Sequence, residues 1–248
     1  MLGIIGGSGL SELAGLRVTR RRAVRTPYGK PSGALVFGTL RGRKVVFLPR
    51  HGPGHTIPPH EVNYRANIWA LRAQKVKDVV AVASVGGIRA DFGPGALVVP
   101  DQIIDYTHGR RSTYFTRGAQ PVTHIDFTRP YCESLRQRLL KAARAAGDAP
   151  VAEGTYAATQ GPRLETAAEI DRLERDGAHL VGMTGMPEAA LAREIGLCYA
   201  ALAIVVNHAA GRGASEHGIL LEDIRLVSER AIGRVHAILE QLVMLDDG

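Results

Sequence analysis

The sequence predicts an α/β fold, and three observations carry this prediction. Apolar runs of strand length, at residues 2–5, 78–84 and 198–206, alternate with segments in which apolar residues recur at helical spacing. The 248 residues suit one large domain, which buries about three-quarters of the surface of the unfolded chain. No repeat, linker or low-complexity segment interrupts the chain, so we expect a single domain over residues 1–248.

The charge balance is basic, with 31 Lys and Arg against 24 Asp and Glu, a formal net charge of +7. Apart from the run at residues 20–22, the basic residues are scattered. Aromatic residues make up only 5% of the chain, which is few for stacking nucleobases along a strand. We therefore expect a small anionic substrate, or simply a solvated basic surface, and no nucleic-acid partner.

The cysteine content indicates a reducing compartment. Cys132 and Cys198 are too few for a disulfide framework, and Cys198 begins an apolar run. Neither a basic leader nor a long apolar segment follows Met1, so the sequence contains no targeting or membrane signal. A cytoplasmic protein without membrane contact is expected.

The first strand, residues 2–5, leads into a loop of three glycines around Ser8. Such a loop can cradle phosphate, because bare backbone N–H groups approach an anion closely. The spacing of the dinucleotide-binding fingerprint fails after Gly9, and a tight turn explains the loop equally well.

A β-hairpin, residues 34–40 and 44–48, leads into an irregular loop that contains four prolines and three histidines. In this loop Arg50 offers a planar fork that matches phosphate oxygens, and His51 adds a donor that can be charged near neutral pH. A metal would need three converging ligands, and acidic partners nearby are sparse, so no metal is expected. A rigid surface loop is the alternative.

After this loop apolar residues again recur at helical spacing, which predicts a helix whose apolar face places Trp69 in the core. The face consists of Val62, Ala66, Trp69 and Ala73. The strand at residues 78–84 ends with Ala83 and Ser84 and opens into two glycines, and residues 97–104 form the next predicted strand.

Residues 105–130 are polar and irregular, and a loop of this length in a domain is usually functional or an assembly contact. A basic amphipathic surface helix follows at residues 131–146, and then a strand at residues 152–159. Beyond this strand lies Glu165, whose simplest role is to interact with the N-terminus of the next helix.

Residues 182–207 deliver two polar side chains at strand ends. A strand ends at Gly182 before Thr184, a short helix covers residues 188–195, and the apolar run 198–206 stops at Asn207. Open α/β sheets bind ligands at the carboxyl ends of their strands. A final helix is predicted from its apolar face, Ile224, Val227, Ala231, Val235, Ile238 and Leu242.

No Ser-His-Asp order, nucleophile elbow or Walker loop occurs, so these residues suit the binding of an oxyanion beside a polar heterocycle. In these motifs the sequence resembles the trimeric 5′-methylthioadenosine and purine nucleoside phosphorylase family over nearly its whole length. The matching segments are residues 6–9, 49–55, 63–71, 161–163, 182–188 and the run into Asn207.

The resemblance implies a central mixed sheet flanked by helices and phosphorolysis of a purine nucleoside, with inorganic phosphate as co-substrate and no cofactor or metal. It also implies a homotrimer with sites near the subunit interfaces. Met183 would lie against the ribose, and His124 would reach into a neighbouring subunit near the 5′ group. The phosphate-binding residues would be Ser8, Arg50, His51, Ala83, Ser84 and Thr184.

Three positions at which the chain departs from the adenine-directed members concern the base. Those members carry Asp at the positions of Asn207 and Ala209, and commonly a small residue at the position of Glu165. The Asn207 amide can accept from N7–H and donate to O6, while Glu165 can accept from the N1–H that adenine lacks. The pair of Asn207 and Glu165 predicts a 6-oxopurine. The expected catalytic residues are Asn207 and His51.

The 5′ side of the substrate is predicted to be apolar. Family members that act on inosine and guanosine have a histidine near the 5′-hydroxyl, whereas this chain has Ile219, Leu220 and Leu221 in that region. Such a wall suits a methylthio group, although packing of the last helix explains these residues too. A 6-oxopurine with an apolar 5′ group specifies 5′-methylthioinosine.

Four alternatives remain open from the sequence. Within the family they are a 5′-methylthioadenosine phosphorylase and a broad inosine and guanosine phosphorylase. Outside the family, a nucleotide- or anion-binding protein without turnover would carry the same anion-binding residues. A nucleic-acid binder would need basic residues clustered on one face, which the sequence alone does not show.

Overall fold

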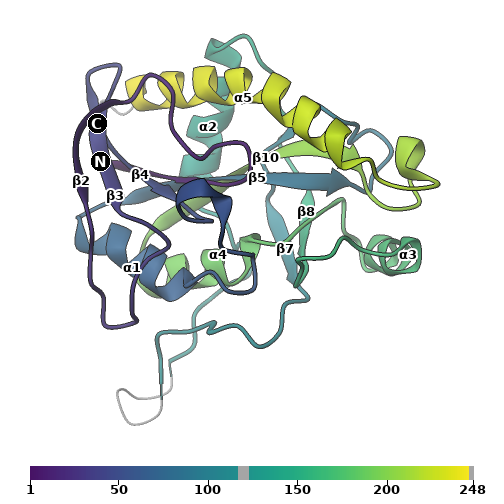
Figure 1. Cartoon of the computed structure of the whole chain (residues 1–248), viewed down its shortest axis with the longest axis horizontal. Helices are drawn as coiled ribbons and strands as arrows, with labels where there is room; N and C mark the ends of the chain where they lie inside the picture. The colour runs from purple at the N-terminus through teal and green to yellow at the C-terminus, as the bar shows by residue number, and fades with distance from the viewer. Residues whose placement is uncertain (117–122, 246–248) are drawn as a thin grey trace.

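The computed structural model describes residues 1–116 and 123–245 and shows one sheet between two layers of helices (Figure 1). The strands are β1 (Leu2–Gly6), β2 (Arg17–Arg22), β3 (Leu35–Leu40), β4 (Arg43–Pro49), β5 (Asp78–Gly87), β6 (Leu97–Val98), β7 (Gln102–Asp105), β8 (Thr155–Ala158), β9 (Leu180–Gly182) and β10 (Cys198–His208). The α-helices are α1 (Tyr64–Ala73), α2 (Glu133–Ala145), α3 (Ala167–Arg175), α4 (Gly185–Glu194) and α5 (Leu221–Met244).

The sheet is mixed, with the order β2-β3-β4-β1-β5-β9-β8-β7, and β10 pairs with β5 and β6. Its centre is parallel, because β1 lies between β4 and β5 and β10 runs alongside β5. The hairpin of β3 and β4 is antiparallel, and so is the short pairing of β5 with β9. The predicted α/β fold with a mixed central sheet flanked by helices is confirmed.

Helices cover both faces of the sheet, with α2 and α5 on one side and α1 and α4 on the other (Figure 1). The central strands are buried on both faces, which explains why they read as continuous apolar runs. Leu139 of α2 and Ile238 of α5 belong to one core cluster, and Ile68 of α1 and Leu191 of α4 belong to the other.

The single strand expected at residues 97–104 is wrong. The structure divides it into β6, which pairs with β10, and β7, which pairs with β8. Pro100 lies between the two and has no N–H to donate to a ladder, so the chain changes partners there.

One further local expectation is corrected, and one strand was not predicted. Trp69 is only half-buried and Ala73 is exposed, because the inward face of α1 instead carries Tyr64, Ile68 and Leu71. Strand β2 had no sequence prediction, since every one of its residues is exposed and its RVTRRR sequence has no apolar alternation.

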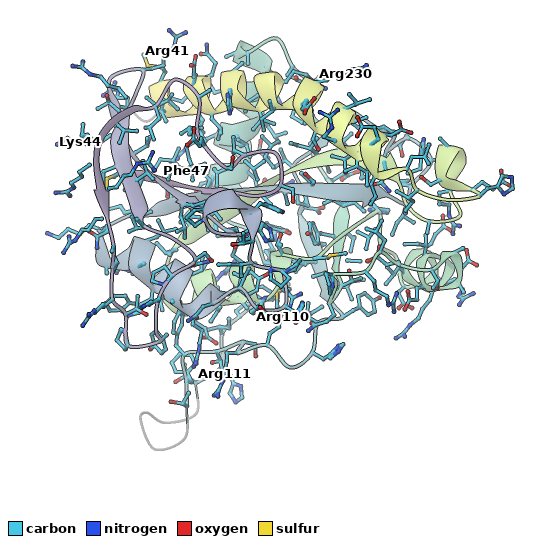
Figure 2. All side chains as sticks on the ribbon, in the orientation of Figure 1. Arg41, Lys44, Phe47, Arg110, Arg111 and Arg230 are labelled. Carbon is cyan, nitrogen blue, oxygen red and sulfur yellow. A yellow bond between two sulfur atoms is a disulfide. The ribbon has the colours of Figure 1, made fainter. Side chains whose placement is uncertain are left out.

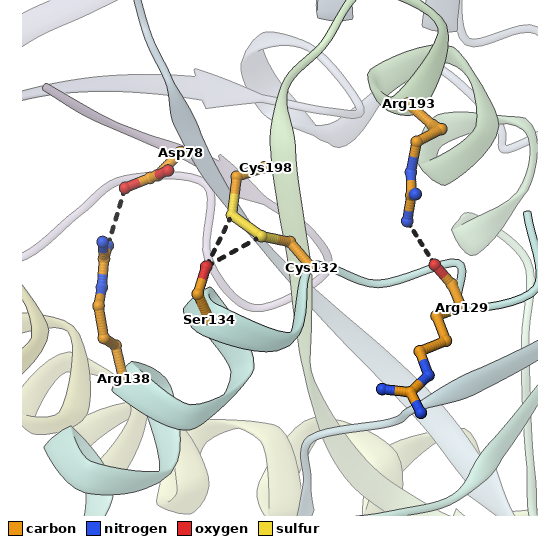
Figure 3. The surroundings of a disulfide bond; sticks show 7 residues. All are labelled: Asp78, Arg129, Cys132, Ser134, Arg138, Arg193 and Cys198. Carbon is orange, nitrogen blue, oxygen red and sulfur yellow. Dashed lines mark hydrogen bonds and ion pairs between the residues drawn. A yellow bond between two sulfur atoms is a disulfide. The ribbon is translucent and has the colours of Figure 1, made fainter. Parts of the chain in front are cut away.

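The two cysteines are paired. Cys132, which precedes α2, forms a disulfide with Cys198 at the start of β10, with 5.2 Å between the Cα atoms (Figure 3). The side chains are 66 residues apart in sequence, so their spacing carried no sign of this pairing. The prediction of a reducing compartment therefore loses its argument from unpaired cysteines.

In the parts of the chain that the structure describes, no helix is both long enough and apolar enough to span a membrane.

Candidate active site

The carboxyl ends of the parallel strands β1, β4 and β10 open onto one cavity of about 580 Å³. This volume is in the range of small-molecule sites. The loops after β1 and β4 supply one side of the cavity, and the ends of β9 and β10 supply the other. Strand β9 reaches the same place although it runs against β5, because its last residue, Gly182, lies next to Val85.

Most of the residues selected from the sequence line this cavity. Side chains or backbone from both the anion-binding set and the base-binding set contribute, so the topology brings the two sets together. The lining includes Ser8, Arg50, His51, Ala83, Ser84, Glu165, Met183, Thr184 and Asn207.

Two selected residues lie elsewhere. Leu221 is the first residue of α5 and its side chain is 71% exposed, so the expectation that it forms the 5′ wall is corrected. Ile219 and Ile224 line the cavity in its place, because they flank the helix start on the inner side. His124 is exposed in the long loop and lines no part of the cavity within this chain.

Arg50 is held in a fully buried ion pair. Its Nε lies 2.8 Å from Glu188 Oε2 and its Nη2 lies 2.9 Å from Glu188 Oε1, with the two side chains 1% and 0% exposed. The Tyr199 hydroxyl donates to the same carboxylate at 2.8 Å. Glu188 comes from α4 and Arg50 from the end of β4, so this bidentate contact ties a helix to the loop of the site.

The guanidinium also donates from Nη1 to the carbonyl oxygen of Val82 at 2.9 Å. Three of its five N–H groups thus bond to residues that the structure describes, which leaves two for an anion. Burial alone would lower the pKa of Arg50, but the charge and hydrogen bonds of Glu188 outweigh it and raise that pKa above its ordinary value. Gly7 permits this approach, since a Cβ there would lie 2.8 Å from Nη1.

His51 is neutral at pH 7 in the free protein. Burial, and then the charge of Arg50, lower its pKa from 6.5 to about 4. Its Nδ1 lies 2.8 Å from the carbonyl oxygen of Ile57, so Nδ1 carries the proton and donates. The sequence expectation of a charge near neutral pH is therefore wrong for the free protein, and Nε2 remains as a hydrogen-bond acceptor.

This burial predicts how stability depends on pH. In the unfolded chain His51 takes up a proton below 6.5, whereas the folded protein resists this down to about 4. Between these values the unfolded state binds more protons, so the free energy of unfolding falls as the pH falls. We expect the melting temperature to drop less in His51→Gln than in the wild type between neutral pH and about pH 5.

Thermal unfolding of both proteins at the two pH values measures this difference. His217→Gln is the matched control, because His217 is exposed. Equal pH dependence in the wild type and in His51→Gln would contradict the assignment of a buried neutral imidazole.

The other anion-facing side chains are fixed by hydrogen bonds. Ser84 donates to the carbonyl oxygen of Ser8 at 3.2 Å, and the hydroxyl of Ser8 lies 3.3 Å from Nε2 of His55. Thr184 is buried, and its backbone N–H lies 3.4 Å from the hydroxyl of Tyr156. Serine and threonine hydroxyls beside one arginine make a donor-rich pocket for an oxyanion.

A β-bulge brings Asn207 to the cavity. The pairing of β10 with β5 shifts by one residue between Val205 and Asn207, which re-aims the side chains after an otherwise regular buried strand. Nδ2 of Asn207 donates to the carbonyl oxygen of His208 at 2.6 Å. Its second N–H and its Oδ1 have no partner among the described residues, so one donor and one acceptor remain for a ligand.

Glu165 does not cap the following helix. Thr166 is the N-cap of α3 and forms a capping box with Glu169. Glu165 instead accepts from the hydroxyl of Thr159, with 2.6 Å between the two oxygens. Glu165 is part of the cavity wall.

Arg110 holds together the loops of the site, and this role was not predicted from the sequence. It lies in the long loop (Figure 2). It donates to the carbonyl oxygens of Met183 at 2.8 Å and of Met186. It also donates to the carbonyl oxygens of Thr159 and Gln160 at 3.2 and 2.8 Å. One guanidinium thus joins the loops after β8 and β9, the two that carry Glu165 and Thr184.

Within residues 1–116 and 123–245, no three His, Cys, Asp or Glu side chains are grouped so as to hold a metal ion.

Comparison with known proteins agrees with the geometry. The model of the phosphorylase superfamily matches residues 1–244. A probable S-methyl-5′-thioinosine phosphorylase of Pseudomonas syringae is 52% identical over 240 residues, 97% of each chain. A probable 6-oxopurine nucleoside phosphorylase of Thermococcus kodakarensis is 47% identical over 85% of this chain and 80% of its own.

A solved structure is similar over its whole fold. Methylthioadenosine phosphorylase from Schistosoma mansoni in complex with adenine superposes with a TM-score of 0.93 and 36% identity, covering 98% of this chain and 91% of that one. The family match over nearly the full length and these relatives lead to one conclusion. The chain belongs to the phosphorylase superfamily.

Proposed function

We propose that this protein catalyses the phosphorolysis of 5′-methylthioinosine, giving hypoxanthine and 5-methylthioribose 1-phosphate. The observation that carries this proposal is the placement of Glu165 and Asn207 on the wall of the cavity that Arg50 also lines. Relatives named as probable S-methyl-5′-thioinosine phosphorylases support the same substrate.

The base end of the cavity favours a 6-oxopurine on chemical grounds. Glu165 offers a carboxylate acceptor, which matches the N1–H of hypoxanthine and has no partner on adenine N1. The free N–H and oxygen of Asn207 match O6 and N7–H. A site built from such polar groups rejects a mismatched base by about 10⁴-fold, because buried groups are left unpaired.

The 5′ end is assigned to apolar side chains. Ile219 and Ile224 line the cavity, together with Met183. A methylthio group is compatible with these neighbours, whereas a 5′-hydroxyl would lose its hydrogen bonds to water without gaining a partner among these three side chains. This contrast supports a methylthionucleoside over inosine.

In the proposed reaction a phosphate oxygen attacks C1′ of the ribose with inversion. The C1′–N9 bond breaks and its electron pair passes to the purine. Hydrogenphosphate loses its proton in the reaction and hypoxanthine gains one proton at nitrogen, so the protons balance. Arg50 and Thr184 bind and orient the dianion, and His51 can accept its P–OH proton in a hydrogen bond at Nε2. Asn207 stabilises the charge that develops on O6 and N7.

Three further assignments belong to this proposal. Inorganic phosphate is the co-substrate, at the end of the cavity that Ser8, Arg50 and Thr184 line. We also propose a homotrimer in the cytoplasm, in which the exposed His124 completes a neighbouring subunit's site. Sedimentation velocity of the purified chain tests the trimer.

The assay that tests the function compares three substrates with phosphate: methylthioinosine, methylthioadenosine and inosine. We expect hypoxanthine release from methylthioinosine with the highest kcat/KM. A higher value for methylthioadenosine would refute the base assignment, and a higher value for inosine would refute the 5′ assignment. Phosphate-dependent stabilisation without release of any base would leave only a binding protein.

A further inference from the structure

Glu165 is held by a hydroxyl that the proposed reaction does not use. Thr159 follows directly after β8, and its Oγ1 lies 2.6 Å from Glu165 Oε1. The next acceptor of this hydroxyl, the carbonyl oxygen of Gly182, is 3.3 Å away, so the single hydroxyl proton points to the carboxylate. Oε2 of Glu165 makes no hydrogen bond to any residue that the structure describes.

The backbone around Thr159 is fixed on both sides. Its N–H donates to the carbonyl oxygen of Gly182 at 2.8 Å, and its own carbonyl oxygen accepts from Arg110 at 3.2 Å. Because a β-branched side chain has few rotamers, a fixed backbone places the hydroxyl firmly. Thr159 is therefore a rigid anchor, and Glu165, on the irregular segment before α3, is the part that is held.

The charge of Arg163 competes with the hydroxyl of Thr159 for the carboxylate of Glu165. The pKa of Arg163 is raised mainly by its hydrogen bonds with Glu169 and to a smaller extent by the charge of Glu165, so this arginine acts electrostatically on both carboxylates. In the structure both terminal nitrogens of Arg163 bind Glu169, at 2.8 and 2.7 Å. Without Thr159, Glu165 would be free to turn toward this exposed arginine and away from the purine.

We propose that Thr159 is a positioning residue that sets the base preference of the enzyme. By occupying Oε1 of Glu165, its hydroxyl keeps the carboxylate on the cavity wall with Oε2 ready to accept from the N1–H of a 6-oxopurine. This inference rests on the proposed function, since it assigns Glu165 to the base. It adds a determinant outside the cavity lining.

The test is the ratio of kcat/KM for methylthioinosine to that for methylthioadenosine. Thr159→Val keeps the branched shape and removes the hydroxyl, and we expect the ratio to fall by about tenfold, the weight of one hydrogen bond to a charged group. Thr159→Ser keeps the hydroxyl and should retain most of the ratio. Thr155→Val is the matched control, because Thr155 begins β8, the strand that Thr159 directly follows, and its hydroxyl bonds to none of the described residues.

A double-mutant cycle separates positioning from general damage. If Thr159 acts through Glu165, Thr159→Val causes no further change of the ratio in a Glu165→Ala background. An unchanged ratio in Thr159→Val, or an equal fall in both backgrounds, overturns the inference. Should Thr159→Val fail to fold, Thr159→Ala replaces it in the same cycle.

The wild-type enzyme distinguishes this failure from failure of the proposed function. If the wild type does not prefer methylthioinosine, the function itself is wrong. If the wild type has the preference and Thr159→Val keeps it, only the role of Thr159 is wrong.

Discussion

Glu188→Gln lowers the free energy of unfolding by about 3–5 kcal/mol, the typical cost of breaking a buried ion pair. The carboxylate is fully buried and accepts from two nitrogens of Arg50 and from the hydroxyl of Tyr199. Glutamine has no negative charge, so the buried guanidinium loses its counter-ion while it remains out of water. We expect activity to fall too, because this contact fixes the orientation of the guanidinium.

Urea denaturation of the wild type and of Glu188→Gln measures the change in stability. The matched control is Glu229→Gln, which breaks an exposed pair with Arg225 and should cost less than about 1 kcal/mol. If Glu188→Gln loses no more free energy of unfolding than this control, the buried ion pair of Arg50 with Glu188 does not stabilise the fold as we expect. Added phosphate should stabilise the wild type if Arg50 faces the anion.

The strand ends of the site could be predicted because their signal is local. A buried parallel strand reads as an apolar run, and its end is marked by the first polar or glycine residue, as at Asn207 or Gly182. Parallel pairing then brings several such ends to one edge of the sheet. Asn207, Arg50 and Thr184 were accessible to this reasoning although they are far apart in the sequence.

The supporting contacts could not be predicted, because each depends on a partner remote in sequence. Arg110 lies in an irregular loop, and nothing local distinguishes it from the neighbouring Arg111. It nevertheless binds four carbonyl oxygens, three in the loops after β8 and β9 and one, that of Met186, in α4. The disulfide of Cys132 with Cys198 also joins residues that are remote in sequence, so it could not be predicted either.

Strand β2 was not predicted, and Leu221 was placed wrongly on the 5′ wall, for a different reason. An exposed edge strand leaves no hydrophobic pattern, and β2 is rich in arginine instead. At Leu221 an apolar residue type suggested a buried wall, but the start of α5 turns this side chain outward and Ile224 inward. Residue type alone does not determine which side of a helix start faces the ligand.

The base assignment depends on the Asn207 amide more than on any other group, so Asn207→Asp has the largest expected effect on specificity. An aspartate cannot donate to O6 and its charge repels that oxygen, and it also places a second carboxylate on the wall that carries Glu165. One donor to developing charge is worth about 10²–10³ in rate. We expect kcat/KM for methylthioinosine to fall by about that factor, and that for methylthioadenosine to fall much less or to rise.

Adding Glu165→Ser to Asn207→Asp should move the preference further toward the 6-amino base. It removes the acceptor that matches only N1–H, and it relieves the repulsion between the two carboxylates. Steady-state kinetics with both nucleosides measure the two variants, and KM for phosphate is the internal control, because Arg50 and Thr184 are unaltered. If Asn207→Asp leaves the ratio of the two nucleosides unchanged while KM for phosphate also stays constant, the purine does not bind at Asn207. In that case the anion end of the cavity would retain its assignment, and the base would have to bind elsewhere along the wall between Met183 and Ile224.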